Sequence, residues 1–232
     1  MLIACWSPKG GSGTTVIACG LAAVLARSAP SPVHGVLVAD LAGDVPAVLG
    51  LPDPAGPGLG EWLAAGPDVA ASALARLEVD ALPGLRLLPW SPTGSGDAPL
   101  GPGRAEALLD ALSADARPVV ADCGRAATGA GLALAAGAPV SLVVLRPCYL
   151  ALRRALAAPV RPSGVVLLTE LGRSLGRRDV EDVLGVPVRA EVAVDEAVAR
   201  AVDAGVLARR VPRSLGRALR DAVGMGAGQD AA

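Results

Sequence analysis

Aromatic residues are almost absent from this chain of 232 residues, which has three Trp, one Tyr and no Phe. Its hydrophobic content is nevertheless 52%, so the core must be built from Ala, Val and Leu. A chain of this length can bury one sizeable α/β core, or at most two small ones. The composition therefore indicates a globular protein that packs through small aliphatic side chains.

The chain also lacks a net basic charge, because its formal charge is −1. No global basic field is therefore present to attract nucleic acid. The four cysteines form no CxxC pair, so neither a zinc ribbon nor a redox motif of that kind is indicated. The N-terminus shows no basic region followed by a cleavage site, and we expect a cytoplasmic protein.

One uncharged stretch, residues 126–145, is long enough to span a bilayer. It holds three glycines, however, and Pro139 divides it. Its second half, Val140–Leu145, is a β-branched run of strand length. We predict a small-residue helix, a turn and a buried parallel strand in place of a membrane span.

Lysine is scarcer still: Lys9 is the only one, and the other basic charges are arginines. It lies in Pro8–Thr15, which follows the apolar run Leu2–Trp6 and precedes the helical pattern Thr14–Ala26. Strand, glycine-rich loop and helix in this order are the context of a phosphate-binding loop. Glycines let several backbone N–H groups point at one anion, and the helix N-terminus adds its partial positive charge.

The predicted nucleotide site is the loop itself. Its residues are Lys9, Gly10, Gly11, Ser12, Gly13, Thr14 and Thr15. Thr15 falls where such a loop places the hydroxyl that holds Mg²⁺. The alternative is an ordinary turn between a strand and a helix, with Lys9 as a solvated surface residue.

The segment Lys9-Gly-Gly-Ser-Gly-Thr-Thr15 resembles the deviant Walker A loop of the ParA/MinD superfamily, usually KGGxGKT. The resemblance implies ATP and Mg²⁺ as cofactors and a homodimer in which Lys9 acts catalytically on the partner's nucleotide. Thr14 replaces the second lysine of the motif, and this variant is similar to the TadZ/CpaE-like branch, which is associated with pilus assembly and polar localisation. A missing cation at the β- and γ-phosphates implies slow hydrolysis.

Two acidic residues follow the predicted strand Val33–Ala39. Asp40 ends the strand, and Asp44 comes four residues later. This segment resembles switch I of the same superfamily, which implies that Asp44 orients the attacking water and that Asp40 supports Mg²⁺ or the loop. The alternative is that both carboxylates cap the short helix predicted over Val45–Leu49.

A further strand that ends in an acid is predicted over Pro118–Asp122. This is the Walker B pattern, in which a buried strand delivers one carboxylate, here Asp122, to the Mg²⁺ at the edge of the sheet. Gly124 resembles the glycine that lets switch II follow the γ-phosphate. Arg125 is expected to contact phosphate or a partner, or simply to be exposed.

The predicted fold is α/β, a single doubly wound, mostly parallel sheet with helices on both faces, of the P-loop NTPase type. The domain spans residues 1–223, and 224–232 form a disordered tail. Further strands are expected over Leu85–Pro89, Val140–Leu145, Val165–Leu168 and Pro187–Val192. Further helices are expected over Val69–Leu77, Arg104–Ala114, Leu150–Ala157, Arg177–Leu184 and Glu196–Ala204. The loop Trp90–Gly103 is expected to be exposed.

Two segments bear on ligands and membranes. The pair Thr169-Glu170 stands where the superfamily often has an adenine-reading Asn, so the base is not predicted. The C-terminal stretch Arg213–Val223 is either a basic amphipathic membrane helix or a closing helix with one packed face. We favour the closing helix, because the stretch lacks bulky aromatics.

The first functional hypothesis is a nucleotide-dependent dimeric switch that positions cellular cargo, with weak or absent hydrolysis. The alternative is a non-hydrolysing scaffold that recruits division or pilus-assembly components. Nonspecific DNA binding is compatible with either, and only the pairs Arg153-Arg154 and Arg209-Arg210 support it. The sequence names neither the cargo nor the protein partner.

Overall fold

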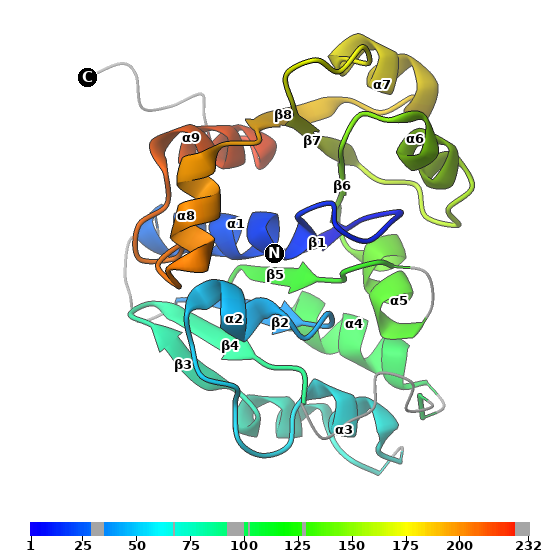
Figure 1. Cartoon of the computed structure of the whole chain (residues 1–232). Helices are drawn as coiled ribbons and strands as arrows, with labels where there is room; N and C mark the ends of the chain where they lie inside the picture. Colours follow the sequence, from blue (N-terminus) through cyan, green and yellow to red (C-terminus); the bar gives the residue numbers. More distant parts are fainter. Residues whose placement is uncertain (29–34, 67, 92–99, 102, 127–128, 226–232) are drawn as a thin grey trace.

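A sheet of eight strands organises the computed structural model, which describes residues 1–28, 35–66, 68–91, 100–101, 103–126 and 129–225 (Figure 1). The strand order is β3-β4-β2-β5-β1-β6-β7-β8, and every neighbouring pair is parallel except β3 with β4. The strands are β1 (Leu2–Trp6), β2 (Val36–Asp40), β3 (Val79–Leu82), β4 (Leu85–Leu88), β5 (Val119–Asp122), β6 (Val140–Leu145), β7 (Gly164–Thr169) and β8 (Val188–Ala193).

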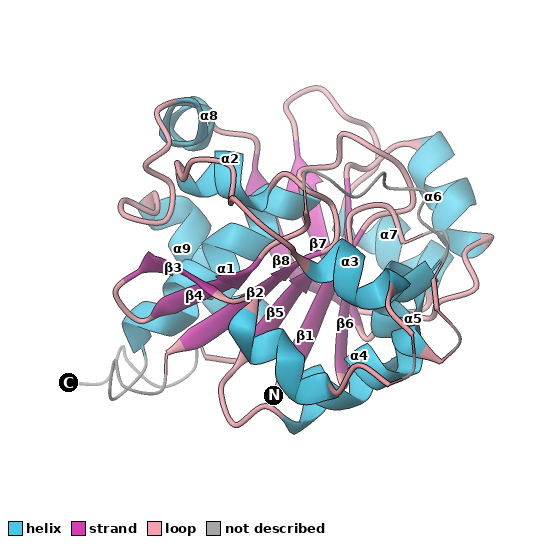
Figure 2. Cartoon of the chain, turned by 90° about the horizontal axis from the view of Figure 1, so that it is seen from below, coloured by secondary structure: helices cyan, strands magenta, loops and turns pink. Residues whose placement is uncertain are grey.

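Helices cover both faces of the twisted sheet (Figure 2). One face carries α1 (Thr14–Ser28), α2 (Val45–Leu49), α8 (Glu196–Asp203) and α9 (Arg213–Ala222). The other carries α3 (Leu59–Ala64), the 3₁₀ helix η1 (Ala71–Arg76), α4 (Arg104–Ala114), α5 (Gly129–Gly137), α6 (Tyr149–Leu156) and α7 (Arg177–Leu184). The predicted doubly wound α/β fold is therefore confirmed.

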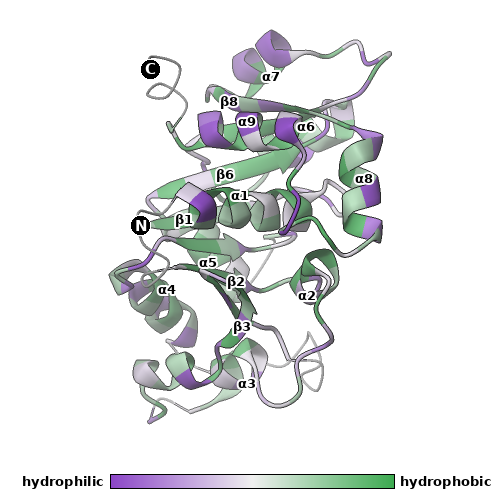
Figure 3. Cartoon of the chain, turned by 90° about the vertical axis from the view of Figure 1, so that its left-hand side faces the viewer, coloured by the Kyte–Doolittle hydropathy of each residue, from purple (hydrophilic) through white to green (hydrophobic). Residues whose placement is uncertain are grey.

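The burial of each strand follows its place in the sheet. All five residues of β1 and of β2 are buried, because helices cover both of their faces. The edge strand β8 alternates between buried and exposed residues instead. The large side chain of Trp6 is 1% exposed and donates a hydrogen bond from Nε1 to Ser141 Oγ at 3.0 Å. Figure 3 shows the hydrophobic strands inside the molecule and hydrophilic residues gathered on the outlying α7.

The structure differs from the sequence prediction at one edge of the sheet. The helix expected over Val69–Leu77 is the shorter 3₁₀ helix Ala71–Arg76. Strand β3, which was not predicted, pairs antiparallel with β4. It is only four residues long and half-exposed, so its own sequence carries little signal, and its pairing with β4 defines it.

The two stretches considered for membranes are both part of the fold. Residues 129–137 form α5, and β6 follows, as predicted for the uncharged stretch. In α9 the apolar side chains of Leu215, Leu219 and Ala222 are buried against α1 and the sheet, so the prediction of a closing helix is confirmed. In the part of the chain that is described, no helix has both the length and the apolar character to cross a bilayer. The predicted tail lies outside the described residues from 226 onward.

Candidate functional site

The glycine loop joins the carboxyl end of β1 to α1. Gly11 and Gly13 adopt φ of 73° and 78°, a left-handed conformation that favours glycine. The carbonyl of Gly13 accepts the first helical hydrogen bond of α1, from Ile17 N at 3.0 Å. The remaining N–H groups of the first turn have no earlier helical carbonyl to bind. The predicted arrangement of strand, glycine loop and helix N-terminus is thus present.

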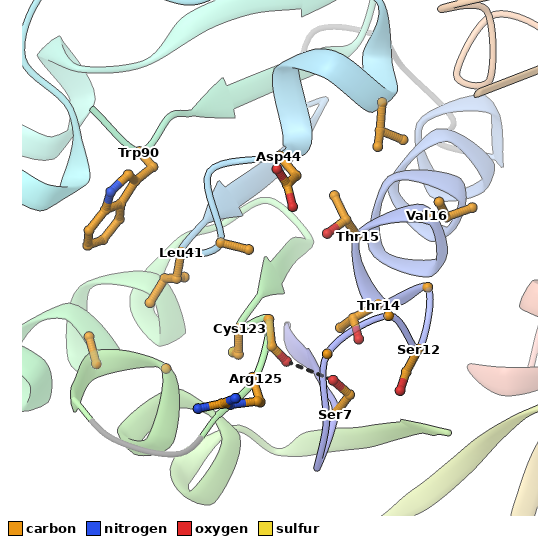
Figure 4. A pocket seen from close by; sticks show the side chains of 18 of the residues that line it. Ser7, Ser12, Thr14, Thr15, Val16, Leu41, Asp44, Trp90, Cys123 and Arg125 are labelled. Carbon is orange, nitrogen blue, oxygen red and sulfur yellow. Dashed lines mark hydrogen bonds between the residues drawn. The ribbon is translucent and has the colours of Figure 1, made fainter. Parts of the chain in front are cut away.

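A cavity of about 1010 Å³ opens beside this loop, at the carboxyl edge of the sheet (Figure 4). The predicted nucleotide-site residues from Gly10 to Thr15 all line it. The segment after β2 contributes Asp44, and the segment after β5 contributes Gly124 and Arg125. The fold therefore brings three loops that are far apart in the sequence to one cavity.

A buried carboxylate, that of Asp122, ends β5 directly before Cys123 and Gly124, which line the cavity. Asp122 is 0% exposed, and its Oδ1 accepts a hydrogen bond from Gly124 N at 3.1 Å. Its Oδ2 is buried with no hydrogen-bond partner among the described residues. Burial raises the pKa of Asp122 to about 6, although the Thr15 hydroxyl lowers it. An unpartnered carboxylate oxygen near a threonine hydroxyl fits a divalent cation such as Mg²⁺, which prefers oxygen ligands.

The carboxylate of Asp40 accepts hydrogen bonds from the backbone of the loop that follows β2. Its Oδ1 accepts hydrogen bonds from Ala42 N at 2.9 Å and Gly43 N at 2.7 Å, and its Oδ2 accepts one from Val45 N at 3.2 Å. Burial raises its pKa, and these three amides lower it. Of the two roles given to Asp40, support of the loop is the one its hydrogen bonds show, and a direct role with Mg²⁺ stays a prediction.

Asp44 has a different environment. It is exposed, lines the cavity and lies at the N-cap position of α2, yet its side chain makes no capping hydrogen bond. The alternative that both carboxylates cap this helix is therefore wrong for Asp44. Figure 4 shows its carboxylate on the same side of the cavity as Thr15, which leaves it free to act on a molecule bound there.

Lys9 is half-buried and is not among the described residues that line the cavity. It forms no ion pair within the described part of the chain. Its carbonyl accepts hydrogen bonds from the hydroxyls of Ser7 at 2.8 Å and Ser12 at 3.0 Å. The backbone of Lys9 is thus held firmly while its ammonium group stays outside its own loop's cavity.

Thr14 is the residue that the sequence pattern aligns with the second lysine of the motif, and that alignment stays a prediction. It is 6% exposed and lines the cavity, so no cation comes from the loop at this point. Arg125, which is exposed, is a basic residue on the cavity wall. Figure 4 shows its guanidinium on the side of the cavity that faces Trp90.

Sequence reasoning missed two residues of this site. Ser7 is 3% exposed, lines the cavity and immediately precedes the glycine-rich segment Pro8–Thr15. Trp90, which was expected to begin an exposed loop, lines the cavity, and the neighbouring Ser91 is buried. A serine immediately before a phosphate loop and a tryptophan at the carboxyl end of β4 were the available signals, and both depend on knowing the strand order.

An ionic cluster lies at the carboxyl ends of β6 and β7. It includes Glu170, from the Thr169-Glu170 pair for which the sequence predicted no base. Glu170 pairs with Arg146 at 2.6 Å and with Arg173 at 2.6 Å. The hydrogen bonds from Arg173 and the charge of Arg146 lower the pKa of Glu170. Glu170 is therefore ion-paired within the chain, with one arginine at each of its carboxylate oxygens.

Comparisons with known proteins place this geometry among solved folds. No protein-family model matches the chain, and no curated relative matches it. The structure is similar to that of a ParA family ATPase from Chlorobium tepidum TLS, with 21% identity, a TM-score of 0.77 and coverage of 96% of this chain and 97% of that one. It is also similar to the septum site-determining protein MinD of Pyrococcus horikoshii OT3 complexed with Mg-ADP, with 20% identity, a TM-score of 0.74 and coverage of 95% and 93%.

A third similar structure is the MinC:MinD cell division protein complex of Aquifex aeolicus, with 18% identity, a TM-score of 0.71 and coverage of 95% of this chain and 93% of that one. These likenesses extend over nearly the whole chain. At these identities they show that the chain has the fold of ParA and MinD ATPases.

Proposed function

We propose that this protein is a nucleotide-dependent switch of the ParA/MinD type, which binds ATP with Mg²⁺ in the cavity beside the glycine loop. The observation that carries the proposal is the buried Oδ2 of Asp122, which has no partner among the described residues and lies near Thr15 at the base of that loop. A glycine loop alone supports anion binding. The loop together with an unsatisfied buried carboxylate supports an anion and a divalent cation side by side.

Each part of the cavity then has a role. The amides of Gly10 to Thr15 bind the phosphates, and the α1 N-terminus adds its partial positive charge. Thr15 and Asp122 hold Mg²⁺, which when bound offsets charge on the phosphate oxygens. Asp44, whose carboxylate is free of capping bonds, orients a water molecule. The fold neighbours support this assignment, since one is named an ATPase and another is complexed with Mg-ADP.

Hydrolysis is expected to be slow. Thr14 supplies no cation to the β- and γ-phosphates, and the arginine on the wall lies in the loop after β5. A switch with slow turnover spends long periods in its ATP-bound state. The alternative is a scaffold that binds no nucleotide or never hydrolyses it, and still recruits division or pilus-assembly components.

The proposed output of the switch is a homodimer that positions cellular cargo. Lys9 supports it, because the one lysine of the chain is not among the residues that line the cavity and forms no ion pair with the described residues. The loop pattern, with Thr14 in place of a lysine, supports a likeness to the TadZ/CpaE-like branch. A MinD-like neighbour in complex with MinC supports the idea of a separate protein partner, and the cargo of this chain is not specified by that likeness.

A calorimetric titration tests the nucleotide site. Wild type should give binding heat with Mg-ATP, with Mg-ADP and with a non-hydrolysable ATP analogue. Gly13→Ala should lose at least tenfold in affinity, because Gly13 has φ of 78° and an added Cβ would lie 3.1 Å from Leu168 Cδ2. Gly224→Ala is the matched control, with φ of 74° and no neighbour within 4 Å. Absence of heat in wild type at millimolar Mg-ATP would favour the scaffold.

A further inference from the structure

Ser7 connects two loops of the cavity through one hydroxyl group. Its Oγ lies 2.8 Å from the carbonyl oxygen of Lys9 and 3.4 Å from that of Gly124. The contact with Gly124 is the dashed line in Figure 4. The backbone N–H of Ser7 also donates to the Gly124 carbonyl, at 2.9 Å. Ser7 thus touches the backbone of the glycine loop and the backbone of the loop after β5.

A serine hydroxyl has one proton to donate. The Ser7 Oγ lies 2.8 Å from the Lys9 carbonyl oxygen and 3.4 Å from that of Gly124, so the shorter and stronger hydrogen bond is the one donated to Lys9. Rotation of the hydroxyl would transfer it to Gly124. The two carbonyls therefore compete for the same donor, and a shift of Gly124 toward Ser7 would release one of the two hydroxyl bonds that hold Lys9.

Gly124 lies close to the loop that follows β2. Its φ is 53°, and a Cβ at this position would lie 3.0 Å from the Cβ of Ala42. Ala42 belongs to the loop that Asp40 holds through its amide hydrogen bonds. Gly124 therefore adjoins the loop after β2 on one side and Ser7 on the other, so a displacement of either loop toward the other would act on the Gly124 carbonyl.

We infer that Ser7 is a positioning residue, which links the position of the Gly124 carbonyl to the orientation of Lys9. Ser7 needs no contact with nucleotide for this role. It sets where the backbone of Lys9 lies, and through it where the single ammonium group of the loop is presented to a second copy of the chain. This inference rests on the proposed function, since it explains how the same nucleotide site would be linked to Lys9.

The single lysine makes the inference measurable. An amine-reactive reagent followed by mass spectrometry reports the accessibility of Lys9 alone, with the N-terminal amino group as an internal reference. In wild type, Mg-ATP should lower the labelling rate of Lys9 at least threefold relative to Mg-ADP, because the ammonium becomes covered in the dimer. In Ser7→Ala this difference between ATP and ADP should disappear, and sedimentation should show dimerisation weakened about tenfold.

Ser12→Ala is the matched comparison. Ser12 also donates to the Lys9 carbonyl, at 3.0 Å, but has no bond to Gly124. If Ser7 only holds the Lys9 carbonyl, as Ser12 does, both variants will reduce the difference in Lys9 labelling between ATP and ADP equally. That result would overturn the inference. If Ser7 links Gly124 to Lys9, Ser7→Ala will have the larger effect, and Ser7→Thr, which keeps the hydroxyl, will restore part of it.

Two measurements separate this inference from the proposed function. Titration of each variant with Mg-ADP shows whether the site still binds, and thermal unfolding shows whether the buried position tolerates the change. Binding and dimerisation by wild type with an unchanged Ser7→Ala would refute the role of Ser7 and leave the switch intact. No binding by wild type would refute both.

Discussion

Asp40 and Asp122 are register partners at the carboxyl ends of the neighbouring parallel strands β2 and β5. Both are 0% exposed, and burial raises the pKa of both carboxyl groups. They differ in their surroundings, since Asp40 binds three backbone amides while one oxygen of Asp122 has no partner among the described residues. The pair therefore combines a carboxylate that builds a loop with one that remains available for a cation.

The first prediction concerns the pH dependence of stability without Mg²⁺. The pKa of Asp122 is about 6 in the folded protein and about 4 in an unfolded chain. Between these values the folded state binds more protons than the unfolded state, so stability falls as pH rises from about 4 to 6 and then levels off. This difference corresponds to about 3 kcal/mol.

Asp122→Asn tests the assignment. The variant should unfold at a higher temperature than wild type at pH 7.5 without Mg²⁺, because no charge is buried, and its stability should depend less on pH between 4 and 6. Added Mg²⁺ with nucleotide should stabilise wild type and leave the variant almost unchanged. A less stable variant under metal-free conditions would show that the charge of Asp122 stabilises the fold, and would contradict its assignment as an uncompensated carboxylate.

The second prediction concerns the rate of hydrolysis. Thr14 is buried on the cavity wall, and under the proposed function it replaces the lysine that phosphate loops generally carry. Thr14→Lys should raise turnover tenfold or more, because about 1.4 kcal/mol of transition-state stabilisation suffices for a factor of ten. Thr14→Met, which has similar length and no charge, is the control. A colorimetric phosphate assay that finds fast wild-type turnover, unaffected by either change, would contradict the role given to this position.

The third prediction concerns two glycines that end helices. Gly50 after α2 and Gly185 after α7 both adopt the left-handed conformation, with φ of 69° and 65°. A Cβ at Gly50 would overlap the carbonyl of Gly205, whereas one at Gly185 would lie 3.8 Å from an arginine side chain. Gly185→Ala should cost about 1 kcal/mol of stability, and Gly50→Ala clearly more. Equal costs in urea unfolding would mean that the backbones of α2 and α8 can separate freely.

Local patterns predicted much of this fold and site. Apolar runs that end in an acid predicted β2 and β5, and glycine spacing predicted the loop before α1, because each signal lies within a few residues. The roles of Ser7 and Trp90 were not predictable in that way. They depend on β1, β4 and β5 meeting at one edge, a consequence of strand order that no short segment encodes. Strand β3 was missed for the same reason, since its pairing partner defines it.

The fourth prediction concerns DNA. The pairs Arg153-Arg154 on α6 and Arg209-Arg210 before α9 are both exposed, and they lie on opposite faces of the sheet. The second pair is followed by two further exposed arginines, Arg213 and Arg217, and the first by one, Arg161. If the chain binds duplex DNA, changing Arg209 and Arg210 to Ala should weaken binding. The slope of log affinity against log salt concentration should also become shallower, by the amount that corresponds to about two phosphate contacts. Fluorescence anisotropy should show a smaller effect for the α6 pair, and equal effects would argue against an α9 surface.

The last prediction concerns assembly. Lys9 has its carbonyl fixed by two hydroxyls and its side chain outside its own cavity, so its charge is available to a facing subunit. In a two-fold dimer each lysine would meet the partner's phosphates, and the contact would occur twice. A charge that pairs with the γ-phosphate binds the ATP state better than the ADP state, which is the differential affinity that a switch needs.

Sedimentation in ATP, ADP and no nucleotide should therefore show that ATP favours the dimer and that ADP does so less. Lys9→Ala should still bind nucleotide, because the amides of the loop are unchanged, but should lose the shift toward the dimer. Lys9→Arg is not expected to restore it fully, since a planar guanidinium differs in shape and hydration from an ammonium. If the profiles of wild type and Lys9→Ala coincide in all three conditions, Lys9 does not act on a second copy. The energy of any dimer must then come from other surfaces.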